Sequence, residues 1–134
     1  MNNVQTIEHV YEWFAAGNAA AILATFDPNI EFRLAQGHPY RGEDGAWVGP
    51  DEVVKNFFMK AGPEWQNWSI EVISLHDLGD VVVTEGRYHG VYKPTGRRMD
   101  VEVCHVWRFR DGKIVMFHQY VDTARLRLVM GAGV

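Results

Sequence analysis

The segment from Met99 to Asp122 constrains the fold most, because it reads as two long strands joined by a turn that contains glycine. Side chains in a strand alternate between the two faces of a sheet, so the first strand has one apolar face. That face consists of Val101, Val103, His105, Trp107 and Phe109. Burial and hydrogen bonding set the protonation of an imidazole in such surroundings, as in pocket acids and bases. The pattern therefore indicates a pocket around His105, although it names no reaction.

The turn of this hairpin decides which side chains share a face with His105, since a slip of one residue sends every side chain to the opposite face. A two-residue Asp111-Gly112 turn sets His105 opposite His118. A three-residue loop that ends in a left-handed Gly112 brings Gln119 beside His105 instead. The residues of the hairpin alone leave both registers open.

Length and charge narrow the class of protein. The 134 residues, 47% of them hydrophobic, suffice for a single domain over residues 1–134 and are too few for two. The net charge of -4 and the lack of a Lys/Arg run argue against nucleic acid and anionic membranes as partners. The start of the chain lacks the features of a signal peptide, Cys104 is the single cysteine, and no apolar run approaches the ~18 residues of a membrane span. We therefore expect a cytoplasmic protein.

Helical signals fill the first part of the chain. Apolar residues at helical spacing over residues 4–14 predict a first helix, with an asparagine at position 2 or 3 as its cap and Gly17 at its end. Asn18 can cap a short second helix that includes Phe26 and ends at Asp27-Pro28-Asn29, ahead of a strand at about residues 30–35.

A third helix is expected to start at Gly49-Pro50-Asp51 and to stop at Gly62-Pro63. Between the first strand and this helix, residues 36–49 contain four glycines and predict a loop, of the kind that often forms the rim or lid of a cavity. Within this loop, His38 is expected to be exposed to solvent, and Trp47 is expected to be an apolar anchor.

The second half of the chain predicts a sheet. Its β-rich runs cover residues 68–75, 81–92, 98–110 and 113–121, and the short connections between them suit antiparallel neighbours. Helices followed by strands form the α+β pattern. We therefore expect three N-terminal helices packed on a strongly curved, mostly antiparallel sheet, with the helices covering its concave side.

This order of elements resembles the nuclear transport factor 2-like superfamily, and within it the SnoaL-like polyketide cyclases and the ketosteroid isomerase-related proteins. The most specific part of the resemblance is the final hairpin, HVWRFRDGKIVMFHQYVDTARL, and the segment YEWFAAGNAAAILATFDPNIEF is similar to the leading helices and first strand. The resemblance implies a cone-shaped α+β barrel, a small apolar ligand in a deep cavity, and pairing of two copies through their sheets. It also favours the register that brings Gln119 beside His105.

The resemblance carries over only part of the known catalytic sites. The oxyanion-binding acid of the isomerase falls on His105, whereas its base and its tyrosine fall on Leu34 and Val10. The cyclases use a histidine and an aspartate fourteen residues apart, and these fall on His105 and Gln119. One superfamily scaffold carries many activities, so the fold alone does not choose among them.

Other chemistries lack their residues in this chain. The Arg-x-Asp pair of the related epoxide hydrolases falls on Gly86 and Tyr88, which argues against epoxide hydrolysis. The histidines form no H-x-H or H-E-x-x-H motif, and the C-terminal GAGV cannot be a dinucleotide loop because it follows the last element. We therefore expect no metal and no cofactor.

The hypothesis for the site is that neutral His105 acts as a general acid or base, while Tyr88 and Gln119 hydrogen-bond an adjacent carbonyl or oxyanion of the substrate. The competing interpretation is a core histidine satisfied by Tyr88 or Gln119. The remaining lining residues are expected to be Phe32, Leu34, Trp47, Phe57, Val101, Val103, Trp107 and Phe117. A mostly apolar wall with a few polar groups is typical of a small-molecule site.

Three functions remain open. The first is a cofactor-free isomerase, cyclase or dehydratase-like lyase that transfers a proton on a small apolar carbonyl compound. The second is a non-catalytic binding protein of the same fold, which the absence of acids at Leu34, Tyr88 and Gln119 favours. The third is an assembly or regulatory module that uses the sheet surface. The apolar outer face near Cys104 and Tyr120 suggests a homodimer in each case.

Overall fold

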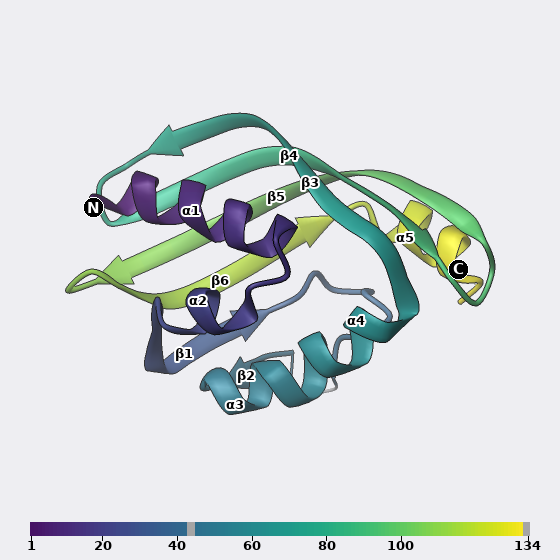
Figure 1. Ribbon diagram of the computed structural model, residues 1–134, viewed down its shortest axis with the longest axis horizontal. Coiled ribbons are helices and arrows are strands. Elements are labelled where there is room, and N and C mark those ends of the chain that lie inside the picture. The colour runs from purple at the N-terminus through teal and green to yellow at the C-terminus, as the bar shows by residue number, and fades with distance from the viewer. Residues whose placement is uncertain (43–44, 133–134) are drawn as a thin grey trace.

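The computed structural model describes residues 1–42 and 45–132, which form one curved sheet with helices against one of its faces (Figure 1). The strand order is β2-β1-β6-β5-β4-β3. β1 runs parallel to β6, and all other neighbours are antiparallel. The strands are β1 (Phe26–Arg33), β2 (Trp47–Val48), β3 (Trp65–Asp77), β4 (Val81–Tyr92), β5 (Arg97–Arg110) and β6 (Lys113–Val121). The edge strands β2 and β3 do not pair, so the sheet curves into an open cone and does not close into a barrel.

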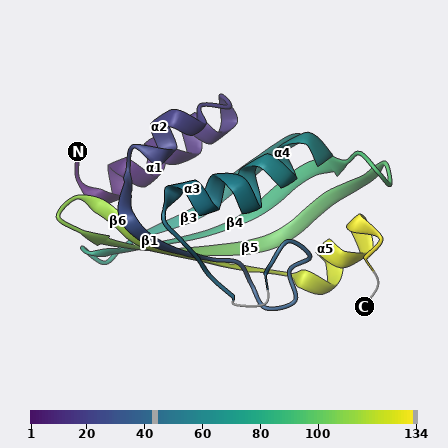
Figure 2. The same ribbon diagram turned by 90° about the horizontal axis from the view of Figure 1, so that it is seen from below.

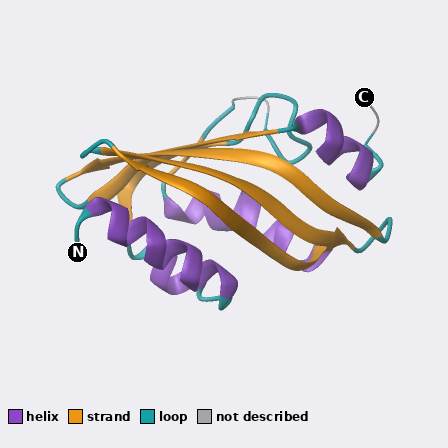
Figure 3. Ribbon diagram, turned by 90° about the horizontal axis from the view of Figure 1, so that it is seen from above, coloured by secondary structure: helices purple, strands orange, loops and turns teal. Residues whose placement is uncertain are grey.

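The N-terminal helices and the helical segment after β2 cover the concave face of this sheet, as Figure 2 shows. The helical elements are α1 (Asn3–Ala15), α2 (Ala19–Leu23), α3 (Pro50–Val53), the π-helix η1 (Val54–Phe58), α4 (Met59–Glu64) and α5 (Thr123–Met130). α5 lies apart from the other helices, beyond the far end of β6 (Figure 3). The α+β architecture expected from the sequence is confirmed.

The cap of α1 is a reciprocal pair between Asn2 and Gln5. The Asn2 side chain accepts a hydrogen bond from the Gln5 backbone N–H at 2.8 Å, and the Gln5 side chain accepts one from the Asn2 backbone N–H at 3.0 Å. Two of the donors that a helix N-terminus leaves without partners are thereby satisfied. Gly17 follows the helix at a φ of 72°, as its predicted role at the helix end requires.

The third helical segment differs from the prediction at its end and in its middle. It runs through Gly62 and Pro63 and ends at Glu64, so the proline lies in the last turn, where its missing N–H removes one hydrogen bond to the preceding turn. Its centre is the π-helix η1, which carries Phe57 and Phe58. π-helical turns are rare and often occur at functional sites.

Two further boundaries differ from those predicted. β1 begins at Phe26, which was expected to belong to the second helix, and Asp27-Pro28-Asn29 lies within the strand, where the pairing with β6 is irregular. α5 was not predicted, although Asp122 is a suitable cap and its side chain accepts a hydrogen bond from the Arg125 backbone N–H at 3.0 Å.

The register of the last hairpin combines features of both alternatives. Arg110 pairs with Lys113, so the loop is the two-residue turn, with Asp111 and Gly112 at φ values of 51° and 76°. The register then shifts at Val115, which is an extra residue on β6. The expected three-residue loop is therefore wrong, but the bulge has the same effect on pairing as an added loop residue.

Beyond this bulge, His105 pairs with Gln119 and Trp107 pairs with Phe117. The inward face of β6 therefore carries Phe117 and Gln119, whereas His118 and Tyr120 lie on the outer face. A short turn with a bulge thus gives the register that places Gln119 beside His105.

Gly86 on β4 fits a close approach of β3. A Cβ atom at this position would lie 2.5 Å from the backbone oxygen of Glu71, so a larger residue would push the two strands apart. The β3–β4 register also shifts between Val72 and Ser74, next to this point. The position aligned with the epoxide hydrolase arginine therefore has no room for a side chain.

Candidate functional site

His105 lies at the centre of a buried chain of hydrogen bonds inside the cone. Its Nδ1 atom lies 2.8 Å from the hydroxyl of Tyr11 on α1, and its Nε2 atom lies 2.6 Å from the hydroxyl of Tyr88 on β4. The Tyr11 hydroxyl donates to Thr84 at 2.7 Å and accepts from the indole N–H of Trp107 at 3.1 Å. Both ring nitrogens of His105 are therefore engaged.

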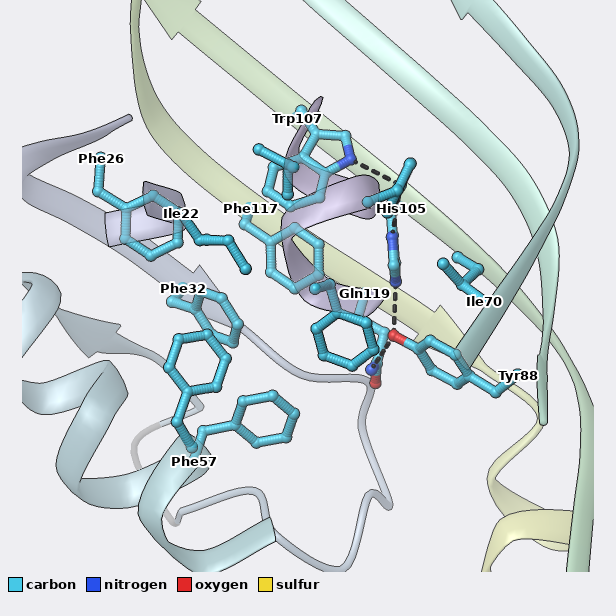
Figure 4. Close-up of a pocket in the computed structure, with 14 residues that line it drawn as sticks. Ile22, Phe26, Phe32, Phe57, Ile70, Tyr88, His105, Trp107, Phe117 and Gln119 are labelled. Carbon is cyan, nitrogen blue, oxygen red and sulfur yellow. Dashed lines mark hydrogen bonds between the residues drawn. The ribbon is translucent and has the colours of Figure 1, made fainter. Parts of the chain in front are cut away.

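The amide of Gln119 lies at the far end of this series of hydrogen bonds. Its nitrogen donates to the Tyr88 hydroxyl at 3.0 Å. Figure 4 shows His105, Tyr88 and Gln119 joined in this order, with the Tyr88 hydroxyl between the other two side chains. The sequence placed these residues in one site, and the structure brings all three together.

The positions of the protons in this series of hydrogen bonds follow from the partners at its two ends. The Tyr11 hydroxyl gives its own hydrogen to Thr84, so it accepts the hydrogen of His105 Nδ1. The Nε2 atom of the neutral imidazole is then an acceptor, and Tyr88 donates to it. The Tyr88 oxygen in turn accepts the Gln119 N–H, which leaves the Gln119 carbonyl oxygen pointing away from this bond.

Burial keeps every group of this chain uncharged. It lowers the pKa of His105 from its ordinary value of 6.5 to about 3, because an imidazolium would lose its hydration in the core. Burial also raises the pKa of Tyr11 and of Tyr88 above that of a free tyrosine. At neutral pH these hydrogen-bonded side chains are all uncharged, and together they form what we call the neutral relay. In it, His105 can accept a proton only if a nearby anion forms at the same time.

The hydrogen-bonded chain borders an inner chamber of about 60 Å³. Its walls are otherwise apolar, and no described residue that lines it carries a charged side chain. The lining residues are Val10, Tyr11, Phe14, Ile22, Phe26, Phe32, Phe57, Phe58, Ile70, Tyr88, His105, Trp107, Phe117 and Gln119. Figure 4 shows phenylalanines of β1, η1 and β6 on one side of the chamber and Tyr88 with His105 on the other.

An outer chamber of about 260 Å³ adjoins the inner one at the helices. The two share Phe14, Ile22, Phe57 and Phe58, which therefore separate them. The outer chamber is completed by Trp65, Trp68 and residues of α2 and α4. These four side chains thus stand between the outer chamber, which lies between the N-terminal helices and α4, and the inner chamber at His105.

Four of the predicted apolar lining residues border the inner chamber, namely Phe32, Phe57, Trp107 and Phe117. The other four lie elsewhere. Val101 and Val103 are buried on β5 outside the lining, and Leu34 and Trp47 lie against a separate small hollow near β2.

Tyr11 is a site residue that was not predicted from the sequence. It lies among the apolar residues at helical spacing over residues 4–14, and the tyrosine of the isomerase falls on the preceding residue, Val10. In the structure Tyr11 holds the Nδ1 side of His105. The available signal was a tyrosine hydroxyl on a helix face that must cover a sheet with one buried histidine, since buried hydroxyls need partners.

The prediction that His38 is exposed is wrong. Its side chain is 4% exposed, its Nδ1 atom accepts a hydrogen bond from the Tyr40 backbone N–H at 3.1 Å, and burial lowers its pKa to about 4. Gly37, at a φ of 86°, turns the chain here, and Arg127 of α5 donates to the Gly37 carbonyl at 2.7 Å. α5 therefore helps to hold this loop; residues 43–44 of the predicted loop lie outside the described residues.

The described residues provide neither a metal site nor a membrane-spanning helix. Within residues 1–42 and 45–132, no group of three or more His, Cys, Asp or Glu side chains is placed to hold a metal ion. Among the helices of the same ranges, none is long and apolar enough to cross a bilayer.

The fold is that of the nuclear transport factor 2-like proteins. A protein of this class from Burkholderia thailandensis shares 35% sequence identity and a TM-score of 0.89, over 97% of this chain and 98% of that one. Another from Burkholderia pseudomallei shares 26% sequence identity and a TM-score of 0.87, over 96% of this chain and 97% of that one. TerC, solved after co-crystallization with polyporic acid, shares 22% sequence identity and a TM-score of 0.84, over 96% of this chain and 98% of that one. No match was found among curated proteins.

The family itself is defined by sequence. The profile of the SnoaL-like domain matches residues 7–117. The chain belongs to the SnoaL-like domain family.

Proposed function

We propose that this chain binds a small, uncharged, mostly apolar molecule with an oxygen-bearing end, and that this end lies against Tyr88 and Gln119. The observation that carries the proposal is the inner chamber, whose apolar wall meets one neutral, hydrogen-bonded group of polar side chains. A charged ligand would lose its hydration there without gaining an opposite charge. An uncharged ligand avoids that cost.

The comparison with TerC supports a small-molecule ligand, because that protein has the same fold and was co-crystallized with polyporic acid. The dimensions of the chambers agree with such a ligand. Drug-sized ligands occupy about 300–1,000 Å³, so the inner chamber of about 60 Å³ holds only one end of the molecule. The body would then extend past the phenylalanines into the outer chamber.

Titration with paired probes tests this function. Quenching of tryptophan fluorescence reports binding, since Trp107 lines the inner chamber and Trp68 the outer one. We expect 4-fluorobiphenyl to bind and biphenyl-4-carboxylate to bind at least about tenfold more weakly, because of the cost of burying its charge. An equal or stronger affinity for the carboxylate would contradict the proposal.

A matched pair of variants locates the binding site. Ile70→Trp adds a large side chain to the wall of the inner chamber, and Leu78→Trp adds the same side chain at a position that is 68% exposed. We expect only Ile70→Trp to abolish binding of 4-fluorobiphenyl. Loss of binding in Leu78→Trp, or its retention in Ile70→Trp, would place the ligand elsewhere.

A second candidate function is proton transfer, and the 2.6 Å hydrogen bond between Tyr88 and His105 favours it. In this step the Tyr88 oxygen accepts a proton from an acidic C–H of the substrate, and the Tyr88 hydrogen moves to His105 Nε2. The products are the enolate and an imidazolium, which lie close together and stabilise each other. The low pKa of His105 opposes this step, so binding is the better supported function.

Hydrogen exchange tests the second candidate. The acidic C–H groups of 2-tetralone exchange with D₂O, and NMR follows the rate. We expect the protein to accelerate the exchange and His105→Gln to lose about 10²–10⁴-fold of that acceleration. A rate equal to that of buffer would exclude this chemistry for the probe and leave the binding function in place.

For the outer face of the sheet we propose a second copy of the chain as partner. Tyr120 is 50% exposed and stacks on His118 with ring centroids 4.0 Å apart, and Ile73 is 62% exposed. Tyr120 and Ile73 border a shallow hollow that also carries Arg87 and Glu102. In a two-fold dimer the same surface of each copy faces the other, so positively and negatively charged side chains of the two copies would lie opposite one another.

A further inference from the structure

The described residues contain two buried side-chain polar atoms without a hydrogen-bond partner, and both belong to residues that line the chambers. One is the carbonyl oxygen of Gln119, a residue of the inner chamber, and the other is the indole nitrogen of Trp68, a residue of the outer chamber. A buried polar atom without a partner costs about 1–3 kcal/mol. Two such atoms on residues that line adjoining chambers indicate that a ligand supplies their partners.

Gln119 cannot satisfy its own oxygen by turning its amide over. Its nitrogen donates to the Tyr88 hydroxyl, which already gives its hydrogen to His105. A turned amide would direct an oxygen at the Tyr88 oxygen, which has no hydrogen left to offer. The series of hydrogen bonds that starts at Trp107 and Tyr11 therefore fixes the Gln119 oxygen as the acceptor that lacks a partner.

The side chain of Gln119 is 1% exposed, so its oxygen has little access to bulk water. It is also the position at which the resemblance to the cyclases puts an aspartate. An ionised aspartate accepts protons and attracts positive charge, whereas an amide oxygen accepts a hydrogen bond and leaves the donor protonated. The replacement changes the group from a candidate base to a recognition element.

We propose that Gln119 determines ligand specificity by accepting a hydrogen bond from a hydroxyl group at the inner end of an elongated apolar molecule. This inference rests on the proposed binding function and adds the class of ligand to it: a neutral phenol, enol or alcohol, and not a ketone or an ether. The hydroxyl lies between Gln119 and Tyr88, and the apolar body passes Phe14 and Phe57 into the outer chamber.

A thermodynamic cycle of two probes and two proteins tests the proposal. The probes are 4-phenylphenol and 4-fluorobiphenyl, which have nearly the same shape but differ in the O–H donor. We expect Gln119→Met to weaken binding of 4-phenylphenol by about tenfold relative to its effect on 4-fluorobiphenyl, the size of one well-made buried hydrogen bond. The cycle cancels the different hydration of the two probes.

The matched control is Ile70→Val, which removes one methyl group from the same chamber. It should change the affinities for both probes by the same factor. If Gln119→Met does not fold, Gln119→Asn replaces it, because this variant keeps an amide and withdraws the oxygen by one methylene.

The outcomes separate this inference from the proposed function. If both probes bind the wild-type protein and Gln119→Met changes both affinities equally, the hydroxyl assignment is wrong and the binding function stands. If neither probe binds the wild-type protein, both proposals are overturned.

Discussion

The hydroxyl oxygen of Tyr88 lies 2.6 Å from Nε2 of His105, and both side chains are more than nine-tenths buried. Among the described residues, His105 is the only histidine that lines the inner chamber. Tyr11 is hydrogen-bonded to its Nδ1 atom and Tyr88 to its Nε2 atom, so both ring nitrogens have partners. Under the proposed function, His105 would therefore act on a ligand through Tyr88. The side chain between His105 and the ligand would be a phenol that is hydrogen-bonded to the histidine.

Removing the Tyr88 hydroxyl should destabilise the fold. In Tyr88→Phe, His105 Nε2 and the Gln119 N–H lose their partner, so we expect the free energy of unfolding to fall by about 1–3 kcal/mol. Urea unfolding at pH 7 measures it. Tyr92→Phe is the control, since its hydroxyl makes only a 3.4 Å hydrogen bond to Glu64. A smaller loss in Tyr88→Phe than in Tyr92→Phe would contradict the assigned network.

Acid should destabilise the protein through two buried histidines. Burial lowers the pKa of His105 to about 3 and that of His38 to about 4, whereas both take up protons near pH 6.5 in the unfolded chain. The unfolded state therefore binds more protons below pH 6.5, and stability is lost as the pH falls from 6.5 toward these values. Between pH 7 and 5 we expect the free energy of unfolding to fall by about 4 kcal/mol, half of it from each imidazole.

Urea unfolding of single variants at the two pH values checks this assignment. His105→Gln should remove about half of the pH-dependent loss, since glutamine does not titrate. The control is His9→Gln, which replaces a histidine whose side chain is 43% exposed, and it should keep the wild-type loss. The same loss in His105→Gln as in the wild type would show that His105 is not buried in its neutral form.

The bulge at Val115 should be removable without a change of register. Arg108 pairs with Met116 and Phe109 with Ile114, so deleting Val115 leaves His105 opposite Gln119, and we expect a loss of less than about 3 kcal/mol. Deleting His118 instead removes a residue beyond the bulge, which turns Gln119, or Phe117 if the bulge is lost, to the outer face. We expect this second deletion to cost at least about 4 kcal/mol or to prevent folding, because a buried side chain leaves the core. Thermal unfolding compares the two deletions, and equal effects would argue against this register.

The outer face should control the oligomeric state. If two copies pair through this face, a charge at Tyr120 will be buried without a partner, and Tyr120→Lys should give a monomer. Sedimentation velocity compares it with the wild type and with Leu128→Lys, an exposed position on α5. A monomeric wild-type protein, or a dimer that persists in Tyr120→Lys, would rule out this interface.

The sequence was sufficient for the parts of the fold that local patterns encode. The alternation along β5 placed His105 on a buried face, and the Asp111-Gly112 turn ended both strands of the hairpin at the observed residues. The bulge was not predictable from the same pattern, because Val115 suits a regular strand as well as a bulged one. The correct register followed from the resemblance to known proteins.

The candidate site was predictable only in part, because it depends on contacts between distant segments. His105, Tyr88 and Gln119 lie on neighbouring strands, so face and register suffice to bring them together. Tyr11 comes from a helix more than ninety residues away from His105, and no local pattern specifies that contact. His38 is buried by a loop and a C-terminal helix whose packing the sequence does not show.

The most direct test of the central claim, that the neutral relay at His105 faces a ligand chamber, is an NMR titration of the ¹⁵N-labelled protein with 4-phenylphenol. The indole signal of Trp107 and the side-chain amide signal of Gln119 report the two ends of the relay. We predict that both signals shift in a saturable way, while the backbone amide of Leu78 at the exposed β3–β4 turn does not move. Saturable shifts confined to the outer face of the sheet, or none at all, would contradict the account.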